Sequence, residues 1–238
     1  MSALPPLALL AGGLATRMRP LTDQIPKSLL EVAGEPFIAH QLRLIRRQGI
    51  TRVVICVGYR GELIREFVGN GSRFDLEVSY SPDGPALLGT GGALRKALPM
   101  LGPEIIVMYG DSWLDTPYAP IVAVFRASAK PALMTVYRNA GQWDRSNVQF
   151  EDGRILRYDK IERTPAMRHI DWGLCMVTAD LLRAQPDGSA FDLASVYTEL
   201  AGRGDLAGFE VATRFYEIGS PDGLRETDAL LRAGNYMR

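Results

Sequence analysis

Hydrophobic and polar positions follow one another along this chain in blocks that predict alternating strands and helices. The first block is an apolar run at residues 7–10, which predicts a buried strand. Residues 37–48 carry apolar side chains at helical spacing and are followed by Gly49, so they predict a helix that ends there. The alternation continues with predicted strands at 52–57, 76–80 and 104–109, and predicted helices at 61–68 and 91–98. Such alternation is typical of a parallel sheet covered by helices on both faces.

The pattern changes beyond about residue 130, where strand-like segments predominate. They lie at 132–136, 147–150, 155–158 and 170–177, and two helices follow at 192–201 and 221–233. The tetrapeptide Glu151-Asp152-Gly153-Arg154 predicts a hairpin turn. Because no long linker, repeat or low-complexity tract divides the chain, we predict one domain over residues 1–238. Its fold class is α/β, with three Rossmann-like layers and a mixed, mostly parallel central sheet flanked by helices.

The composition of the chain gives no sign of a nucleic-acid partner or a membrane partner. The formal net charge is +0, so no excess of basic residues points to nucleic acid or to an anionic membrane. No apolar stretch approaches 18 residues, and the first residues lack the charged start of a signal peptide. Cys56 and Cys175 lie inside apolar runs and are interpreted as core residues. We therefore expect a cytoplasmic enzyme with no nucleic-acid partner and no membrane partner.

Candidate chemistry begins directly after the first predicted strand. Gly12 and Gly13 follow this strand, and they allow backbone N–H groups to approach a ligand closely. Arg17 and Lys27 add two cations shortly afterwards. The glycines are adjacent rather than spaced as in dinucleotide-binding loops, and the chain has no Gly-x-x-x-x-Gly-Lys-Ser/Thr motif. The loop therefore suits a polyphosphate ligand, but in an enzyme that is neither of the ATPase type nor of the dinucleotide-binding type. The alternative is a glycine-rich turn that binds no ligand.

Residues 9–20, which read Leu-Leu-Ala-Gly-Gly-Leu-Ala-Thr-Arg-Met-Arg-Pro, and Pro-Lys-Ser at 26–28 resemble the signature of sugar-1-phosphate nucleotidylyltransferases. The family usually has a third glycine where this chain has Ala15, and a proline where it has Ser28. A Cβ at position 15 disfavours a positive φ. The resemblance implies that Arg17 and Lys27 are catalytic. It also implies that the nucleotide is bound by Leu10, Ala11, Gly12 and Gly13.

Residues 81–92 resemble the second nucleotide-binding segment of the same family, in which a strand ends near the base and a Gly-Thr-Gly-Gly-Ala turn begins a helix. Glycines in this turn allow the main chain to lie against a flat base or a ribose. The resemblance implies nucleotide contacts from Asp83, Gly84, Thr90 and Gly91. The alternative interpretation is an ordinary helix N-terminus that starts with glycine.

Two carboxylates are candidates for a metal site. Asp111 directly follows the predicted strand at 104–109, and its side chain is expected at the carboxyl edge of the sheet. A turn or helix-capping aspartate is the alternative. Glu217 lies in Phe-Tyr-Glu-Ile-Gly-Ser-Pro, which resembles a late family pattern that has Asp at this position. The resemblance implies that Asp111 and Glu217 hold Mg²⁺, a cation that takes carboxylate and phosphate oxygens.

The later part of the chain supplies candidates for the second substrate. Lys160 follows the predicted strand at 155–158 and resembles the family lysine that holds the sugar phosphate; the alternative is a surface lysine. Asp171 is expected to accept hydrogen bonds from sugar hydroxyls, or to be a third carboxylate near the metal. Trp172 is expected to offer its ring face to the sugar. His40 and His169 are interpreted as a helix-surface residue and a loop residue.

The resemblance implies transfer of a nucleoside monophosphate from a nucleoside triphosphate to a sugar 1-phosphate, with nucleotide-binding residues at about 1–130 and sugar-phosphate-binding residues at about 131–238. The overall order most resembles D-glycero-D-manno-heptose 1-phosphate guanylyltransferases, which use GTP. Alternatives are UTP- or dTTP-dependent enzymes acting on N-acetylmuramate 1-phosphate or glucose 1-phosphate, and a CTP:phosphocholine cytidylyltransferase. A regulator that binds sugar nucleotides without catalysis is an alternative from a different class. The sequence leaves open whether the chain forms a homo-oligomer.

Overall fold

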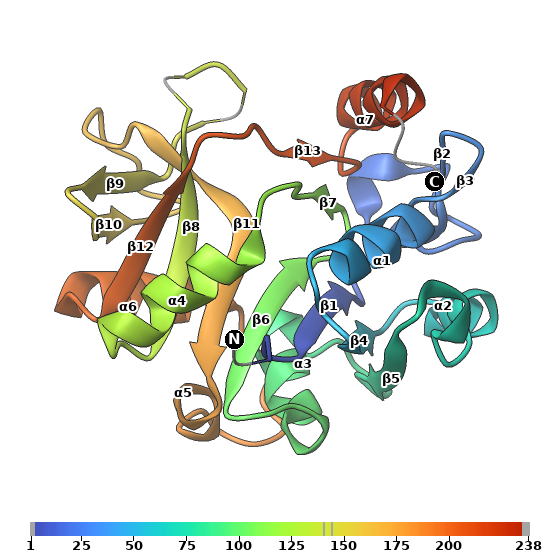
Figure 1. Ribbon diagram of the computed structural model, residues 1–238, viewed down its shortest axis with the longest axis horizontal. Helices are drawn as coiled ribbons and strands as arrows, with labels where there is room; N and C mark the ends of the chain where they lie inside the picture. Colours follow the sequence, from blue (N-terminus) through green and yellow to red (C-terminus); the bar gives the residue numbers. More distant parts are fainter. Residues whose placement is uncertain (1–2, 140, 144, 235–238) are drawn as a thin grey trace.

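One mixed sheet of nine strands runs through the structure, a computed structural model that describes residues 3–139, 141–143 and 145–234. Helices cover both faces of this sheet (Figure 1). In order across the sheet, the strands are β5 (Glu77–Pro82), β4 (Arg52–Val57), β1 (Leu7–Ala11), β6 (Glu104–Tyr109), β11 (His169–Thr178), β8 (Ala132–Arg138), β12 (Leu206–Val211), β10 (Arg154–Tyr158) and β9 (Val148–Glu151). The predicted three-layer α/β fold is confirmed.

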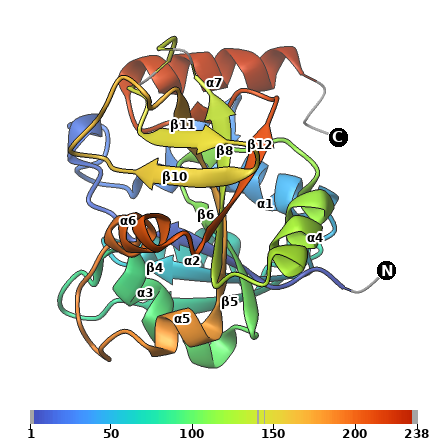
Figure 2. The ribbon, with the colours of Figure 1, turned by 90° about the vertical axis from the view of Figure 1, so that its left-hand side faces the viewer.

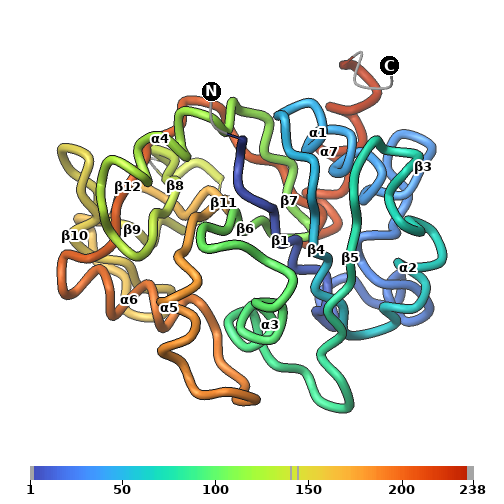
Figure 3. Tube along the Cα trace, turned by 60° about the horizontal axis from the view of Figure 1, so that its bottom comes forward, coloured from blue at the N-terminus to red at the C-terminus, as the bar shows by residue number. Residues whose placement is uncertain are grey.

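The two halves of the sheet differ in strand direction. β5, β4, β1 and β6 are all parallel, and Figure 3 shows the trace of β1 between those of β4 and β6. Nearly continuous apolar sequences are expected for such strands because both of their faces are buried. β11 runs antiparallel to β6 and β8, and β9 pairs with both β10 and β11. The second half of the sheet therefore curls back on itself.

Two apolar cores hold the helices against the two faces of the sheet. One core contains α1 (Phe37–Arg47), α2 (Gly61–Val68) and α4 (Tyr118–Ser128); the other contains α3 (Gly89–Ala97), α5 (Ala179–Arg183) and α6 (Leu193–Arg203). Figure 2 shows α4 and α6 on opposite sides of the strands. A third cluster packs α7 (Pro221–Ala233) against α1 and the short hairpin β2 (Glu31–Val32) and β3 (Glu35–Pro36). None of the helices that the structure describes is long and apolar enough to span a membrane.

Several elements were not predicted from the sequence. The segment of α4 contains Pro120 and β-branched residues, so its helical periodicity is weak. β12 contains Gly208, which has a low strand propensity. A Cβ at this position would lie 2.5 Å from the ring of Phe150, so close packing between strands requires the glycine.

The two histidines do not occupy the predicted surface and loop positions. His40 is only 2% exposed, and its Nε2 lies 2.7 Å from the carbonyl oxygen of Val32, because the β2–β3 hairpin covers this side of α1. His169 is the first residue of β11, is also buried, and lies 3.1 Å from Glu210. Both histidines are therefore packing residues with polar neighbours.

A β-bulge interrupts the pairing of β11 with β8 between Asp171 and Cys175. Gly173 within it has a φ of +97°, a conformation that favours glycine. The side chain of Thr135, which is fully buried on β8, donates a 2.6 Å hydrogen bond to the carbonyl oxygen of Leu174. This hydroxyl gives a partner to a carbonyl in the bulged part of the ladder.

Thr135→Val keeps the shape of the side chain and removes this donor. We expect the free energy of unfolding to fall by about 1–3 kcal/mol, because a buried carbonyl loses its partner. Denaturant titration followed by circular dichroism measures the change. Thr198→Val is the matched control, because the Thr198 hydroxyl donates to Ala194 on an exposed helix face. An equal loss of stability in both variants would contradict the argument.

Candidate active site

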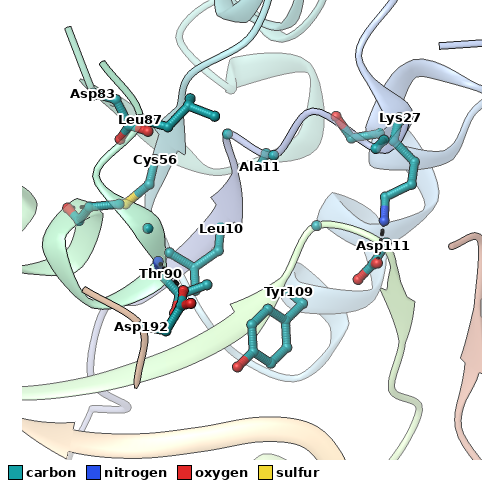
Figure 4. A pocket seen from close by; sticks show the side chains of 17 residues that line it. Leu10, Ala11, Lys27, Cys56, Asp83, Leu87, Thr90, Tyr109, Asp111 and Asp192 are labelled. Atoms are coloured by element: carbon teal, nitrogen blue, oxygen red, sulfur yellow. Dashed lines mark hydrogen bonds and ion pairs between the residues drawn. The ribbon is translucent and has the colours of Figure 1, made fainter. Parts of the chain in front are cut away.

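A cavity of about 300 Å³ lies at the carboxyl ends of β1, β4 and β6. Figure 4 shows its two ends: Lys27 and Asp111 lie at one, and Cys56, Leu87 and Asp83 lie at the other, with the end of β1 between them. The residues that line it are Leu10, Ala11, Gly12, Gly13, Ala15, Lys27, Ser28, Cys56, Asp83, Leu87, Gly89, Thr90, Ala93, Tyr109, Gly110, Asp111 and Asp192. Ligands of open α/β sheets collect at this edge of the strands.

The two adjacent glycines after β1 differ in their surroundings. Gly12 packs against the backbone of a second loop: its carbonyl oxygen accepts a 3.2 Å hydrogen bond from Tyr59 N, and a Cβ on Gly12 would lie 3.0 Å from Gly58 N. Gly13 has no atom within 4 Å of the position that a Cβ would occupy. Gly12 is therefore required for packing, whereas Gly13 leaves space open at the cavity.

Ala15 adopts the left-handed conformation that the third family glycine would favour. Its φ is 49° and its ψ is 42°. The carbonyl oxygen of Ala15 accepts hydrogen bonds from Met18 N at 2.9 Å and from the Thr22 hydroxyl at 3.0 Å. Left-handed backbone costs an L-residue about 1–2 kcal/mol, and these two bonds offset part of that cost. The alanine therefore adopts the left-handed conformation despite its Cβ.

An ion pair forms the charged end of the cavity. Lys27 Nζ donates a 2.5 Å hydrogen bond to Asp111 Oδ2, and the Ser112 hydroxyl donates to Asp111 Oδ1 at 3.2 Å. The neighbour of the lysine, Ser28, is 3% exposed, and its hydroxyl has no partner in the described part of the chain. The structure thus joins the loop after β1 to the end of β6 through opposite charges.

Glu217 lies beside this pair although it is distant in sequence. It belongs to β13 (Tyr216–Glu217), which pairs with β7 (Ser112–Trp113) so that Glu217 is opposite Ser112. Ile218 N also donates a 2.9 Å hydrogen bond to Asp111 O. The position of a Cβ on Gly219 would be 3.4 Å from Asp111 Oδ2 and closer still to Glu217 Oε2. The two carboxylates therefore converge on Gly219, and the resemblance stated above implied that they lie together.

This donor set fits a magnesium ion. Mg²⁺ is held in proteins by one or two carboxylates and completes its octahedron with water and substrate phosphates. Among the described residues, no group of three His, Cys, Asp or Glu side chains could hold a metal alone. Glu217 Oε1 accepts from the Ser220 hydroxyl at 2.8 Å, and Gly219 N donates to Oε2, so the carboxylate is held in place by its own loop.

The opposite end of the cavity is mostly apolar. Cys56 is buried there, and burial raises the pKa of its thiol to about 12, so it remains neutral. Burial also raises the pKa of Asp83, which is 8% exposed. Leu88 N approaches Asp83 Oδ2 at 3.4 Å, whereas Oδ1 has no partner among the described residues. A carboxylate at an apolar wall is suited to select a planar ligand with N–H donors.

Thr90 and Gly91 fix the start of α3 by contacts with the start of α6. The Thr90 hydroxyl donates to Asp192 Oδ1 at 3.2 Å and accepts from Leu193 N at 2.9 Å. Gly91 N donates to Phe191 O at 2.9 Å, and a Cβ on Gly91 would clash with the Phe191 ring. The predicted nucleotide contact from Gly91 is therefore wrong: its N–H is already paired and its Cα faces a side chain. Thr90 does line the cavity.

Lys160 and Asp171 both lie near the cavity. Lys160 follows the end of β10, and Asp171 is part of β11. Lys160 Nζ is 6.0 Å from the centre of the Tyr109 ring, and Tyr109 lines the cavity. Burial raises the pKa of Asp171, and the nearby Lys160 opposes this shift. Asp171 Oδ1 accepts from Gly173 N at 3.0 Å. A cation and a half-buried carboxylate thus extend the site beyond the cavity.

Three other predicted residues lie apart from this cluster. Trp172 is 1% exposed and donates through Nε1 to Thr213 O at 2.8 Å, so its predicted stacking on a sugar is wrong. Successive side chains of a strand point to opposite faces, and Trp172 therefore enters the core when Asp171 faces the site. Arg17 is exposed and Gly84 lies at an exposed turn; neither lines the cavity.

Sequence reasoning missed several residues that line the cavity: Ser28, Cys56, Leu87, Ala93, Tyr109, Gly110 and Asp192. Tyr109 and Gly110 carried a usable signal, because they occupy the carboxyl end of a predicted strand next to Asp111. Asp192 carried none, since it reaches the cavity from a different helix through its contact with Thr90.

This chain is similar in sequence to known nucleotidyl transferases. Residues 8–146 match the nucleotidyl transferase family model. An N-acetylmuramate alpha-1-phosphate uridylyltransferase of Neisseria meningitidis is 41% identical over 108 residues, which are 45% of this chain and 47% of that protein. The enzyme of the same name from Caulobacter vibrioides is 29% identical, over 97% of this chain and 99% of that protein. This chain thus matches only about half the length of the meningococcal relative.

A solved structure supports the same fold. HddC from Yersinia pseudotuberculosis, complexed with GMP-PN, superposes with a TM-score of 0.81 and is 19% identical; the match covers 96% of this chain and 100% of that one. The family match covers more than half of the chain and includes the glycine loop, Lys27 and Asp111. This chain therefore belongs to the nucleotidyl transferase family.

Proposed function

We propose that this chain transfers a nucleoside monophosphate from a nucleoside triphosphate to a sugar 1-phosphate and releases pyrophosphate. One observation carries this proposal: Lys27, Asp111 and Glu217 converge at one end of a cavity whose other end is apolar and closed by Asp83. A triphosphate fits the charged end and a base fits the apolar end. The glycine loop lies between them.

The residues account for the chemistry without a protein nucleophile or a general base. The attacking group is a phosphate oxygen that is already anionic, so no proton has to be removed. The protein has to align two anions that repel each other and to compensate the charge that develops at the α-phosphorus. Lys27 supplies a cation at the point where that charge develops. Lys160 holds the sugar phosphate, and Asp171 accepts hydrogen bonds from sugar hydroxyls.

Arg17 supplies a second cation to the leaving pyrophosphate in this proposal. Its flexible side chain is exposed close to Ala15, which lines the cavity. Its planar guanidinium matches two phosphate oxygens. Asp111 and Glu217 would hold Mg²⁺, which supplies Lewis-acid compensation of phosphate charge when it is bound.

GTP is the proposed donor. Guanine presents two adjacent donors, N1–H and N2–H, to a carboxylate, and the Asp83 carboxylate lines the apolar end of the cavity, with a 3.4 Å contact from Leu88 N to its Oδ2. Uracil and thymine present one N–H between two carbonyl oxygens that a carboxylate repels. These observations favour guanine over the pyrimidines.

The proposed acceptor is D-glycero-D-manno-heptose 1-phosphate, on the resemblance given by the order of the sequence motifs. N-acetylmuramate 1-phosphate is the second candidate, because two uridylyltransferases of that name are similar to this chain. Glucose 1-phosphate with UTP or dTTP, and phosphocholine with CTP, are the remaining alternatives. The shared requirement is a phosphate that Lys160 can hold.

A pyrophosphate-release screen tests the proposal. GTP, UTP, dTTP, CTP and ATP are each combined with these sugar phosphates and with phosphocholine, with Mg²⁺ or with EDTA. We expect release with GTP and the heptose 1-phosphate, and none with EDTA. Turnover with another pair would correct the substrates only. Tight binding of a sugar nucleotide without turnover of any pair would instead indicate a regulator.

Lys27→Ala and Arg17→Ala should each lower turnover by about 100-fold or more, because each removes a cation placed where charge develops. Steady-state pyrophosphate release measures the effect. Arg19→Ala is the matched control: Arg19 belongs to the same loop but forms an exposed ion pair with Asp23 at 3.3 Å. Near-normal turnover of either test variant would remove that residue from the mechanism.

Asp83→Asn tests the base contact. We expect the affinity for GTP to fall by about 10- to 100-fold, because the amide cannot accept from both guanine donors. Xanthosine triphosphate, which has a carbonyl in place of the 2-amino group, should gain affinity in the variant. Calorimetric titration measures both nucleotides without turnover. An unchanged order of GTP over xanthosine triphosphate in the variant would show that Asp83 does not select the base.

A further inference from the structure

Gln41 lies in the middle of α1, where its side chain is fully buried. Its Nε2 donates two hydrogen bonds to backbone carbonyl oxygens, to Tyr109 O at 3.0 Å and to Ser112 O at 2.8 Å. These carbonyls flank Gly110 and Asp111 on either side. One amide group from a distant helix therefore spans the turn that carries the Asp111 carboxylate.

The two carbonyls need this partner because of where they lie. β6 ends at Tyr109 and β7 begins at Ser112, so both groups occur where the main ladder ends. A buried carbonyl without a donor costs about 1–3 kcal/mol. Gln41 Oε1 is itself buried without a partner in the described part of the chain. The opposite amide orientation would place Oε1 against two carbonyl oxygens, and this repulsion keeps the NH₂ group toward the turn.

Gln41 is also linked to Glu217, through the backbone of Ser112. Ser112, whose carbonyl Gln41 holds, is the residue opposite Glu217 in the β7–β13 pair. Ile218 N adds a bond to Asp111 O. Movement of the Asp111 turn would therefore change the position of both carboxylates together.

We propose that Gln41 is the positioning residue that sets the spacing of Asp111 and Glu217 for a divalent cation. The inference rests on the proposed function, which places the cation there. Gln41 contacts neither the cation nor a substrate: it acts through the backbone on both sides of Asp111. Outer-shell contacts of this kind orient metal ligands, and their loss commonly lowers metal affinity by 10- to 100-fold.

Gln41→Met tests the proposal, because methionine nearly preserves the volume and removes both donors. Binding of Mn²⁺ alone is measured by electron paramagnetic resonance of the free ion, and stability is measured by thermal denaturation. We expect the Mn²⁺ dissociation constant to rise by about 10-fold or more. Thr135→Val is the matched control: it also removes a buried donor to a backbone carbonyl, at Leu174, and should lower stability without changing Mn²⁺ affinity.

Gln41→Asn is a second variant in case the methionine variant does not fold. The asparagine keeps the amide, but its side chain is shorter by one methylene, so the amide lies farther from the two carbonyl oxygens. Its Mn²⁺ affinity should lie between those of the wild type and of Gln41→Met. A kinetic measurement adds an independent readout. The Mg²⁺ concentration for half-maximal turnover should rise in Gln41→Asn, by less than in Gln41→Met, with the KM for the nucleotide unchanged, because Gln41 does not line the cavity.

The outcomes separate the two proposals. Wild-type affinity for Mn²⁺ in both Gln41 variants would overturn the positioning role and leave the metal site intact. Loss of stability in Gln41→Asn with no change in metal affinity would assign Gln41 to packing alone and would likewise overturn it. Failure of the wild-type chain to bind Mn²⁺, both alone and in the presence of GTP, would refute the metal site of the proposed function, and the role of Gln41 would be refuted with it.

Discussion

The ion pair between Lys27 and Asp111 is the interaction on which the arrangement of the site depends. It joins the loop after β1 to the turn after β6, two neighbouring parallel strands whose carboxyl ends lie side by side. Without the lysine, Asp111 would lose the ammonium that pairs with it, and a second carboxylate, Glu217, would still lie close by. The ammonium therefore offsets the charge of one of two neighbouring carboxylates.

Backbone packing, rather than charge, shapes the rest of the cavity. Gly12 approaches Gly58 so closely that a side chain at either position would separate two strands. The start of α3 is held by a reciprocal contact in which Thr90 caps α6 and Asp192 bonds to Thr90. These close contacts leave Gly13 facing open space at the cavity.

Most of the site that lies in contiguous motifs could be predicted from the sequence. The strand before Gly12 and the strand before Asp111 were both predicted, because apolar runs mark buried parallel strands. Prediction failed where a neighbour distant in sequence determines the environment. Gly91 belongs to a glycine-rich segment typical of ligand-binding loops, but it packs against the Phe191 ring. Trp172 faces the core because successive side chains of its strand point to opposite faces.

The sequence by itself determined the order of most of the strands and helices, the glycine loop, and the residue types that suit a triphosphate and a divalent cation. These are local properties, because periodicity and turn chemistry depend on neighbours along the chain. Only the tertiary structure decided how Glu217 approaches Asp111, through the pairing of β13 with β7, and that Gln41 holds the turn between β6 and β7. Such contacts depend on the register of strands and on the packing of a helix from another part of the chain, which no short stretch of sequence encodes.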